Sequence, residues 1–192
     1  MIVLKDIPNI LTVTRAALIP FVILFYFLPF SWGNTVAASI FSAACLTDWL
    51  DGYLARRWGA HTKIGALLDP IADKILVVVV LVMLVYSYQS YIITISAIIV
   101  ISREIIISAL REWMAEIGQR NNIKVSILGK IKTLVQMVAL IFLLANDPNN
   151  LLAYAGYILL VIAVLLTLLS MYYYLLNAKK YFIEISNRDN TL

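Results

Sequence analysis

Four aspartates stand out in a chain that is otherwise strongly apolar: Asp48, Asp51, Asp69 and Asp73. The first two are three residues apart and the last two are four apart, so each pair would lie on one face of a helix. Four carboxylates that converge without compensation repel one another strongly. A divalent cation removes this repulsion, and carboxylate oxygens without a soft ligand favour a hard ion such as Mg²⁺ or Mn²⁺. The single cysteine and the single histidine leave no adequate set of ligands for a structural zinc site.

Small and basic residues accompany the aspartates along the same helix faces. Gly52 follows Asp48 by four residues, and Gly65 precedes Asp69 by four. Each glycine removes side-chain bulk beside a carboxylate, so a ligand or another backbone can approach. Arg56 continues the face of Asp48 and Gly52. If the two helices form a hairpin, the two aspartate pairs can meet at one metal site.

The composition indicates that these helices lie in a lipid bilayer. The chain has 192 residues, of which 62% are hydrophobic and 14% are charged, far from the composition of an ordinary soluble domain. A bilayer core about 30 Å thick requires roughly 20 apolar residues per helical span. The apolar residues divide into six such stretches, which we place at 10–30, 36–54, 66–86, 92–114, 128–145 and 151–176. We therefore predict an all-α integral membrane protein with six transmembrane helices, folded as one membrane-embedded domain over residues 1–192.

The basic residues divide the connections between these spans into two groups. In a six-span chain, both termini share one side of the membrane with the connections after the second and fourth spans. The clusters of basic residues on that side comprise Lys5, Arg15, Arg56, Arg57, Lys63, Arg120, Lys124, Lys130, Lys132, Lys179, Lys180 and Arg188. The three opposite connections have no Lys or Arg, and Asp147 is their only charge. The positive-inside rule therefore predicts that both termini are cytoplasmic, and this topology explains the net charge of +4 without a nucleic-acid partner.

The complete aspartate pattern resembles the signature of the CDP-alcohol phosphotransferase family. The positions that carry the resemblance are Asp48, Asp51, Gly52, Ala55, Arg56, Gly65, Asp69 and Asp73. The resemblance implies a six-helix fold, commonly a homodimer. We expect the chain in the bacterial inner membrane, where the topology above places the active site on the cytoplasmic side. The resemblance also implies that a hydroxyl attacks the β-phosphorus of a CDP-alcohol and that CMP departs. Two divalent ions, Mg²⁺ or Mn²⁺, would neutralise the pyrophosphate and stabilise the leaving phosphate.

The same resemblance implies roles for individual residues. The implied metal ligands are Asp48, Asp51, Asp69 and Asp73. Of these, Asp73 would also serve as the general base for the acceptor hydroxyl. The residues that would lie along the cytidine diphosphate are Asp48, Gly52, Arg56 and Gly65. Arg56 would offer a planar set of donors to phosphate there.

Other segments resemble the members of this family that use CDP-diacylglycerol as donor and glycerol 3-phosphate as acceptor. The segments are Ile7-Pro8-Asn9-Ile10-Leu11-Thr12 with Arg15, Arg103-Glu104 with Arg111, and Gly129-Lys130-Ile131-Lys132-Thr133. The implied products are phosphatidylglycerophosphate and CMP. This acceptor is a phosphate dianion, and the candidate cations for it are Arg103, Arg111, Lys130 and Lys132. The two arginines are eight residues apart on one helical stripe, about 12 Å, so both could line the same cavity.

The sequence leaves several alternatives open. The shared motif does not exclude serine, inositol, choline or a second phosphatidylglycerol as the acceptor. Arg103 could pair internally with Glu104 or Glu112, and Lys130 and Lys132 could be ordinary positive charges flanking a span. The aspartates could also line the path of a small metal or proton transporter. A transport site is expected near the bilayer midplane in broken helices, whereas these aspartates lie toward one face.

Overall fold

The computed structural model describes residues 7–58, 63–118 and 127–189, with side chains for 14–47, 71–72, 74–118, 129–176 and 179. Over these residues it consists of α1 (Ile7–Phe27), α2 (Gly33–Trp58), α3 (Lys63–Tyr88), α4 (Tyr91–Glu116), α5 (Ile127–Ala145) and α6 (Leu151–Asp189). The prediction of an all-helical fold with six helices is confirmed for this part of the chain.

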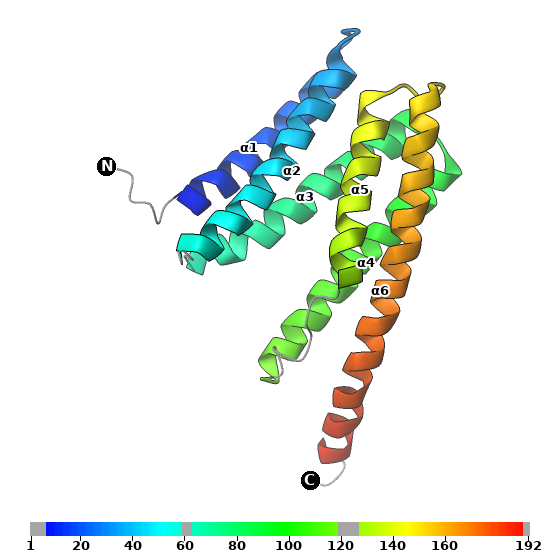
Figure 1. Ribbon diagram of the computed structural model, residues 1–192. Helices are drawn as coiled ribbons and strands as arrows, with labels where there is room; N and C mark the ends of the chain where they lie inside the picture. The colour runs from blue at the N-terminus through cyan, green and yellow to red at the C-terminus, as the bar shows by residue number, and fades with distance from the viewer. Residues whose placement is uncertain (1–6, 59–62, 119–126, 190–192) are drawn as a thin grey trace.

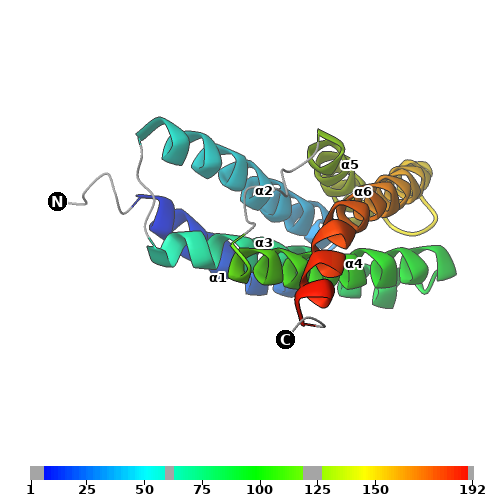
Figure 2. The same cartoon turned by 90° about the horizontal axis from the view of Figure 1, so that it is seen from below.

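Successive helices run in alternating directions (Figure 1). α1 packs against α2 and α3, and α6 packs against α5 and α4. Contacts of α2 and α3 with α5, and of α3 with α4, join the two groups. The lower end of the bundle is the end toward the bottom of Figure 1. The odd-numbered helices α1, α3 and α5 begin there, and the even-numbered helices α2, α4 and α6 end there. Figure 2 views the same helices from below.

Two helices in the described part are long and apolar enough to cross a membrane. They are Tyr91–Glu116 and Leu151–Leu176, each of 26 residues, with mean hydropathy 2.1 and 2.5 in their most apolar windows. A helix of that length extends roughly 39 Å, compared with a bilayer core of about 30 Å. Only 33% of each window is buried within the fold. Most of this apolar surface therefore faces outward, as expected for lipid-facing helices and unlike the core helices of a soluble protein.

The interior is a continuous cluster of apolar side chains to which all six helices contribute. Completely buried members include Val22, Phe41, Leu84, Ile93, Leu143 and Leu160. A smaller cluster of Ile107, Leu110 and Tyr174 joins α4 to α6 nearer the lower end. Because lipid chains are as apolar as leucine, close packing rather than exclusion from water holds helices together in a membrane.

Glycine allows close packing at two places in the bundle. A Cβ at Gly33 would lie 2.5 Å from the carbonyl oxygen of Phe25, so the turn from α1 into α2 has no space for a side chain. A Cβ at Gly156 would lie 2.8 Å from Cγ of Leu143, so α6 lies directly against α5 at this level. Small residues at helix contacts are typical of membrane bundles.

Hydrogen bonds tie the helices together at the upper end. The hydroxyl of Tyr88, in the last turn of α3, lies 2.7 Å from the carbonyl oxygen of Leu143 and 2.6 Å from that of Asn146. Asn34 Nδ2, in the first turn of α2, donates to Asp147 Oδ1 at 3.0 Å. These contacts fix α2 and α3 to the connection between α5 and α6.

The helix ends differ from the predicted spans at several positions. α1 ends at Phe27 rather than at residue 30, since the residue before Pro29 is disfavoured in helical conformation. α6 continues to Asp189, 13 residues beyond the predicted end at 176, for a total of 39 residues. This extension passes beyond the other helices at the lower end of the bundle (Figure 1).

Candidate functional site

The aspartate motif lies on α2 and α3, near the lower end of the bundle (Figures 1 and 2). Asp48 and Asp51 lie in the last three turns of α2, and Asp69 and Asp73 lie in the first three turns of α3. Each pair belongs to an uninterrupted helix, so each keeps its predicted spacing along one face. The motif positions all lie outside the part of the chain whose side chains are described: Asp48, Asp51, Gly52, Ala55, Arg56, Gly65, Asp69 and Asp73.

The chemistry of this donor set fits a hard divalent cation. The set contains four carboxylates and no thiolate or imidazole, and oxygen ligands are those that Mg²⁺ and Mn²⁺ prefer. Among the side chains that the structure does describe, no three His, Cys, Asp or Glu residues gather into a second candidate metal site.

A contact between α2 and α5 relates the motif to the basic residues of α5. Cys45 Sγ lies 3.5 Å from Met137 Sδ. Toward the lower end, Asp48 follows Cys45 by three residues and Lys132 lies five residues from Met137. At 1.5 Å per residue these offsets are about 4.5 Å and 7.5 Å. Asp48 and Lys132 therefore both lie on the lower side of this contact, each along its own helix, and the two helices diverge toward the lower end (Figures 1 and 2).

Three charged side chains meet between α4, α5 and α6. Glu104 Oε1 accepts hydrogen bonds from Arg103 Nη1 at 2.8 Å and from Lys132 Nζ at 2.7 Å. Arg103 Nη2 also donates to Ser170 Oγ at 3.3 Å. The side chains of Arg103 and Lys132 are 6% and 2% exposed, whereas that of Glu104 is 24% exposed. Two buried cations thus share one carboxylate, which leaves one net positive charge.

Further polar atoms near these residues have unused hydrogen-bonding capacity. In the described part of the chain, Arg103 Nε, Gln136 Oε1 and Thr167 Oγ1 are buried without a hydrogen-bond partner. Gln136 lies about one turn from Lys132 on α5, and Thr167 lies about one turn from Ser170 on α6. Buried polar groups are normally paired. This part of the bundle can therefore accept additional polar contacts.

Arg111 lies two turns nearer the lower end of α4 than Arg103. Its Nη2 donates to Tyr174 Oη at 3.0 Å, and its guanidinium carbon lies 5.4 Å from the centre of the same ring. Both arginines therefore contact α6, in keeping with their positions on one stripe of α4. Arg111 and Lys130 are exposed, whereas Arg103 and Lys132 are buried. The four candidate cations thus range from the surface into the interior.

Several of these contacts were not predicted from the sequence. Of the two carboxylates considered for Arg103, Glu104 is the one paired with it. The polar residues of α6 were not recognised, although Thr167, Ser170 and Tyr174 recur at intervals of three and four in an apolar helix. That spacing places them on one face, and polar residues on one face of an apolar helix indicate internal partners.

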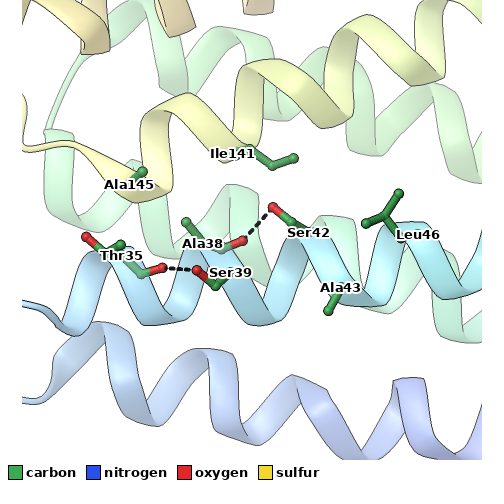
Figure 3. A pocket seen from close by; sticks show the side chains of 8 residues that line it. All are labelled: Thr35, Ala38, Ser39, Ser42, Ala43, Leu46, Ile141 and Ala145. Atoms are coloured by element: carbon green, nitrogen blue, oxygen red, sulfur yellow. Dashed lines mark hydrogen bonds between the residues drawn. The ribbon is translucent and has the colours of Figure 1, made fainter.

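A groove of about 410 Å³ runs between α2 and α5 (Figure 3). Its lining consists of Thr35, Ala38, Ser39, Ser42, Ala43, Leu46, Ile141 and Ala145. Ser39 Oγ donates to the carbonyl oxygen of Thr35, and Ser42 Oγ to that of Ala38, each at 2.7 Å. Because both serine hydroxyls are bonded within α2, the groove offers contact mainly to apolar groups. It reaches Leu46, two residues before the first aspartate of the motif.

Comparison with known proteins gives one consistent assignment. The family model described as CDP-alcohol phosphatidyltransferase matches residues 5–169, which include the aspartate motif and the charged residues of α4 and α5. A protein of Salmonella choleraesuis (strain SC-B67) is 51% identical over 174 residues, or 91% of this chain and 95% of that protein. A protein of Escherichia coli (strain K12) has the same identity and coverage. Both relatives are named CDP-diacylglycerol--glycerol-3-phosphate 3-phosphatidyltransferase. The chain therefore belongs to the CDP-alcohol phosphatidyltransferase family, which confirms the resemblance first seen in its aspartate motif.

Proposed function

We propose that this chain transfers the phosphatidyl group of CDP-diacylglycerol to glycerol 3-phosphate and so produces phosphatidylglycerophosphate and CMP. The observation that carries this proposal is the 51% identity over 91% of the chain to relatives named for that reaction. In the transfer, an acceptor oxygen forms a bond to the β-phosphorus. The bond from that phosphorus to the bridging oxygen breaks, and CMP leaves with that oxygen.

The aspartates form the metal site in this proposal. Two Mg²⁺ or Mn²⁺ ions, when bound, would neutralise the pyrophosphate and stabilise the leaving phosphate. The residues that hold them are Asp48, Asp51, Asp69 and Asp73. Asp73 also accepts the proton of the attacking hydroxyl. The position of both aspartate pairs near one end of the bundle supports this assignment.

The CDP group lies along the same two helices. The residues assigned to it are Asp48, Gly52, Arg56 and Gly65. The two glycines leave room for the nucleotide close to the backbone. Arg56 supplies planar donors to a phosphate of the nucleotide.

The phosphate of the acceptor is bound by the cations of α4 and α5. These residues are Arg103, Arg111, Lys130 and Lys132. A dianion is attracted by the net positive charge of the buried cluster, and such attraction is stronger in a low-dielectric interior than in water. Lys132 and Asp48 lie on the same side of the contact between α2 and α5, which supports an acceptor position toward the CDP group. The acceptor hydroxyl would then point toward the metal site.

The proposed enzyme is a multi-pass protein of the bacterial inner membrane, active as a homodimer. All six helices cross the bilayer, with both termini and the active site at the cytoplasmic side. The alternating helix directions support this topology. The absence of Lys and Arg from the sequence of the three opposite connections also supports it.

The proposal is tested by measuring CMP release from CDP-diacylglycerol by the purified full chain in detergent with Mg²⁺. We expect release with glycerol 3-phosphate and no comparable release with serine, inositol or phosphatidylglycerol. Activity with one of those acceptors, and none with glycerol 3-phosphate, would overturn the acceptor assignment. EDTA should stop the reaction and excess Mg²⁺ should restore it, so full activity in EDTA would exclude the metal site. The transporter alternative gains no support from relatives that are named transferases.

A further inference from the structure

We infer that Glu104 is a positioning residue of the acceptor site, which holds Arg103 and Lys132 in the arrangement that receives the acceptor phosphate. This inference rests on the proposed function. It concerns a residue that binds neither the nucleotide nor the metal in that proposal.

The geometry joins the two cations through one atom. Arg103 Nη1 and Lys132 Nζ both donate to Glu104 Oε1, at 2.8 Å and 2.7 Å. Arg103 comes from α4 and Lys132 from α5, so the carboxylate bridges two helices. Lysine carries its charge on a flexible four-carbon stem, and its ammonium keeps one position only where a partner fixes it. Glu104 is the ion-pair partner observed for Lys132 in the described part of the chain.

The charge balance favours a supporting role for Glu104 over simple neutralisation. One carboxylate facing two cations leaves a net positive charge, so the cluster still attracts an anion. Without Glu104, two buried cations would remain close together, and an unpaired buried charge is strongly unfavourable. The cations would then separate or change rotamer. We therefore expect the loss of Glu104 to weaken phosphate binding although it removes a negative charge.

The test compares two variants at Glu104 with one control variant at Glu112. Glu104→Gln keeps the size of the side chain and an acceptor oxygen but removes the charge. It should raise the KM for glycerol 3-phosphate by about tenfold or more, because the charge-assisted bonds that hold both cations are lost. The KM for CDP-diacylglycerol should change by less than about twofold. Glu104→Asp should restore part of the affinity, while Glu112→Gln, at an exposed position on the same helix, should leave both constants unchanged.

A double variant tests whether Glu104 acts through Lys132. Lys132→Met alone should raise the KM for glycerol 3-phosphate. Adding Glu104→Gln to it should raise the KM by clearly less than the factor seen for Glu104→Gln alone, because the part of its effect that acts through Lys132 is already lost. Fully multiplied effects, or a lower KM in Glu104→Gln than in the original chain, would overturn the inference. The latter result would mean that the carboxylate competes with phosphate.

Two controls separate this inference from its premises. Thermal unfolding of each variant in detergent shows whether the variant is folded. If Glu104→Gln is not folded, the comparison is made with Glu104→Asp, which retains the charge. The unmodified chain is assayed first. If it releases CMP only with another acceptor, the proposed function fails. If it is active with glycerol 3-phosphate and a folded Glu104→Gln has an unchanged KM, only the positioning role fails.

Discussion

Lys130 and Lys132 are separated by one residue yet have different environments. The side chain of Lys132 is 2% exposed and bonded to Glu104, whereas Lys130 is exposed. Residues two apart on a helix point about 160° away from each other, so the two ammonium groups serve different faces. The environment of Lys132 suits an internal phosphate site. That of Lys130 suits either an entrance to the site or a flanking charge.

A change of one side chain in the proposed metal site, Asp69→Asn, should abolish turnover while leaving the protein folded. The change removes a carboxylate charge from the proposed metal site at almost constant volume. Loss of even an outer partner of a metal ligand costs up to roughly 100-fold, so we expect a loss of at least that size in kcat. The measurement is CMP release at saturating substrates, with thermal unfolding as the check on folding. Asp147→Asn, exposed at the other end of the bundle, is the matched control, and turnover in Asp69→Asn equal to this control would contradict the assignment.

Among the helices, the upper end of α3 offers a test of stability. Tyr88→Phe removes the hydroxyl that reaches the carbonyl oxygens of Leu143 and Asn146. The loss of this buried hydrogen bond should lower the free energy of unfolding by about 1 kcal/mol. The measurement is denaturant-induced or thermal unfolding in detergent. Tyr86→Phe, at a ring that is 70% exposed, should have almost no effect, and equal stability of the two variants would show that the Tyr88 bond contributes nothing.

Apolar runs were sufficient to predict the helices, but they do not define where each helix ends. Hydropathy reports the part of a helix that can lie in lipid, and this is why the polar continuation of α6 to Asp189 was missed. Local sterics set other ends, such as the proline after α1 and the glycine that starts α2. The proline and the glycine were visible in the sequence. The position of the neighbouring backbone, on which their effect depends, could not be predicted from it.

The contacts of the candidate site were predicted less completely than its residues. The spacing of Arg103 and Arg111 correctly indicated one stripe on α4. Their partners Ser170 and Tyr174 lie 67 and 63 residues away in the chain, on a helix whose contact face had not been predicted. The resemblance supplied the aspartate roles, which remain proposals.

For the whole molecule, the proposed topology predicts which positions can be labelled from the outer side of the membrane. The chain has one cysteine, so replacing Cys45 with Ala gives a background for new cysteines. In this background, Asn149→Cys should react with a membrane-impermeant thiol reagent on intact spheroplasts. Lys179→Cys should react only after the membrane is opened. Both positions are exposed, so the opposite pattern would reverse the orientation.

The length of α6 determines how far its C-terminal end extends from the membrane. Its 39 residues extend roughly 58 Å, almost twice the thickness of the hydrocarbon core of a bilayer. In the proposed orientation, the 13 residues beyond position 176 would form a helical extension about 20 Å long on the cytoplasmic side of the membrane. A fluorescent domain fused to the C-terminus would be held away from the lipid headgroups. Energy transfer from that domain to a dye in the membrane would then measure the distance between the domain and the membrane surface.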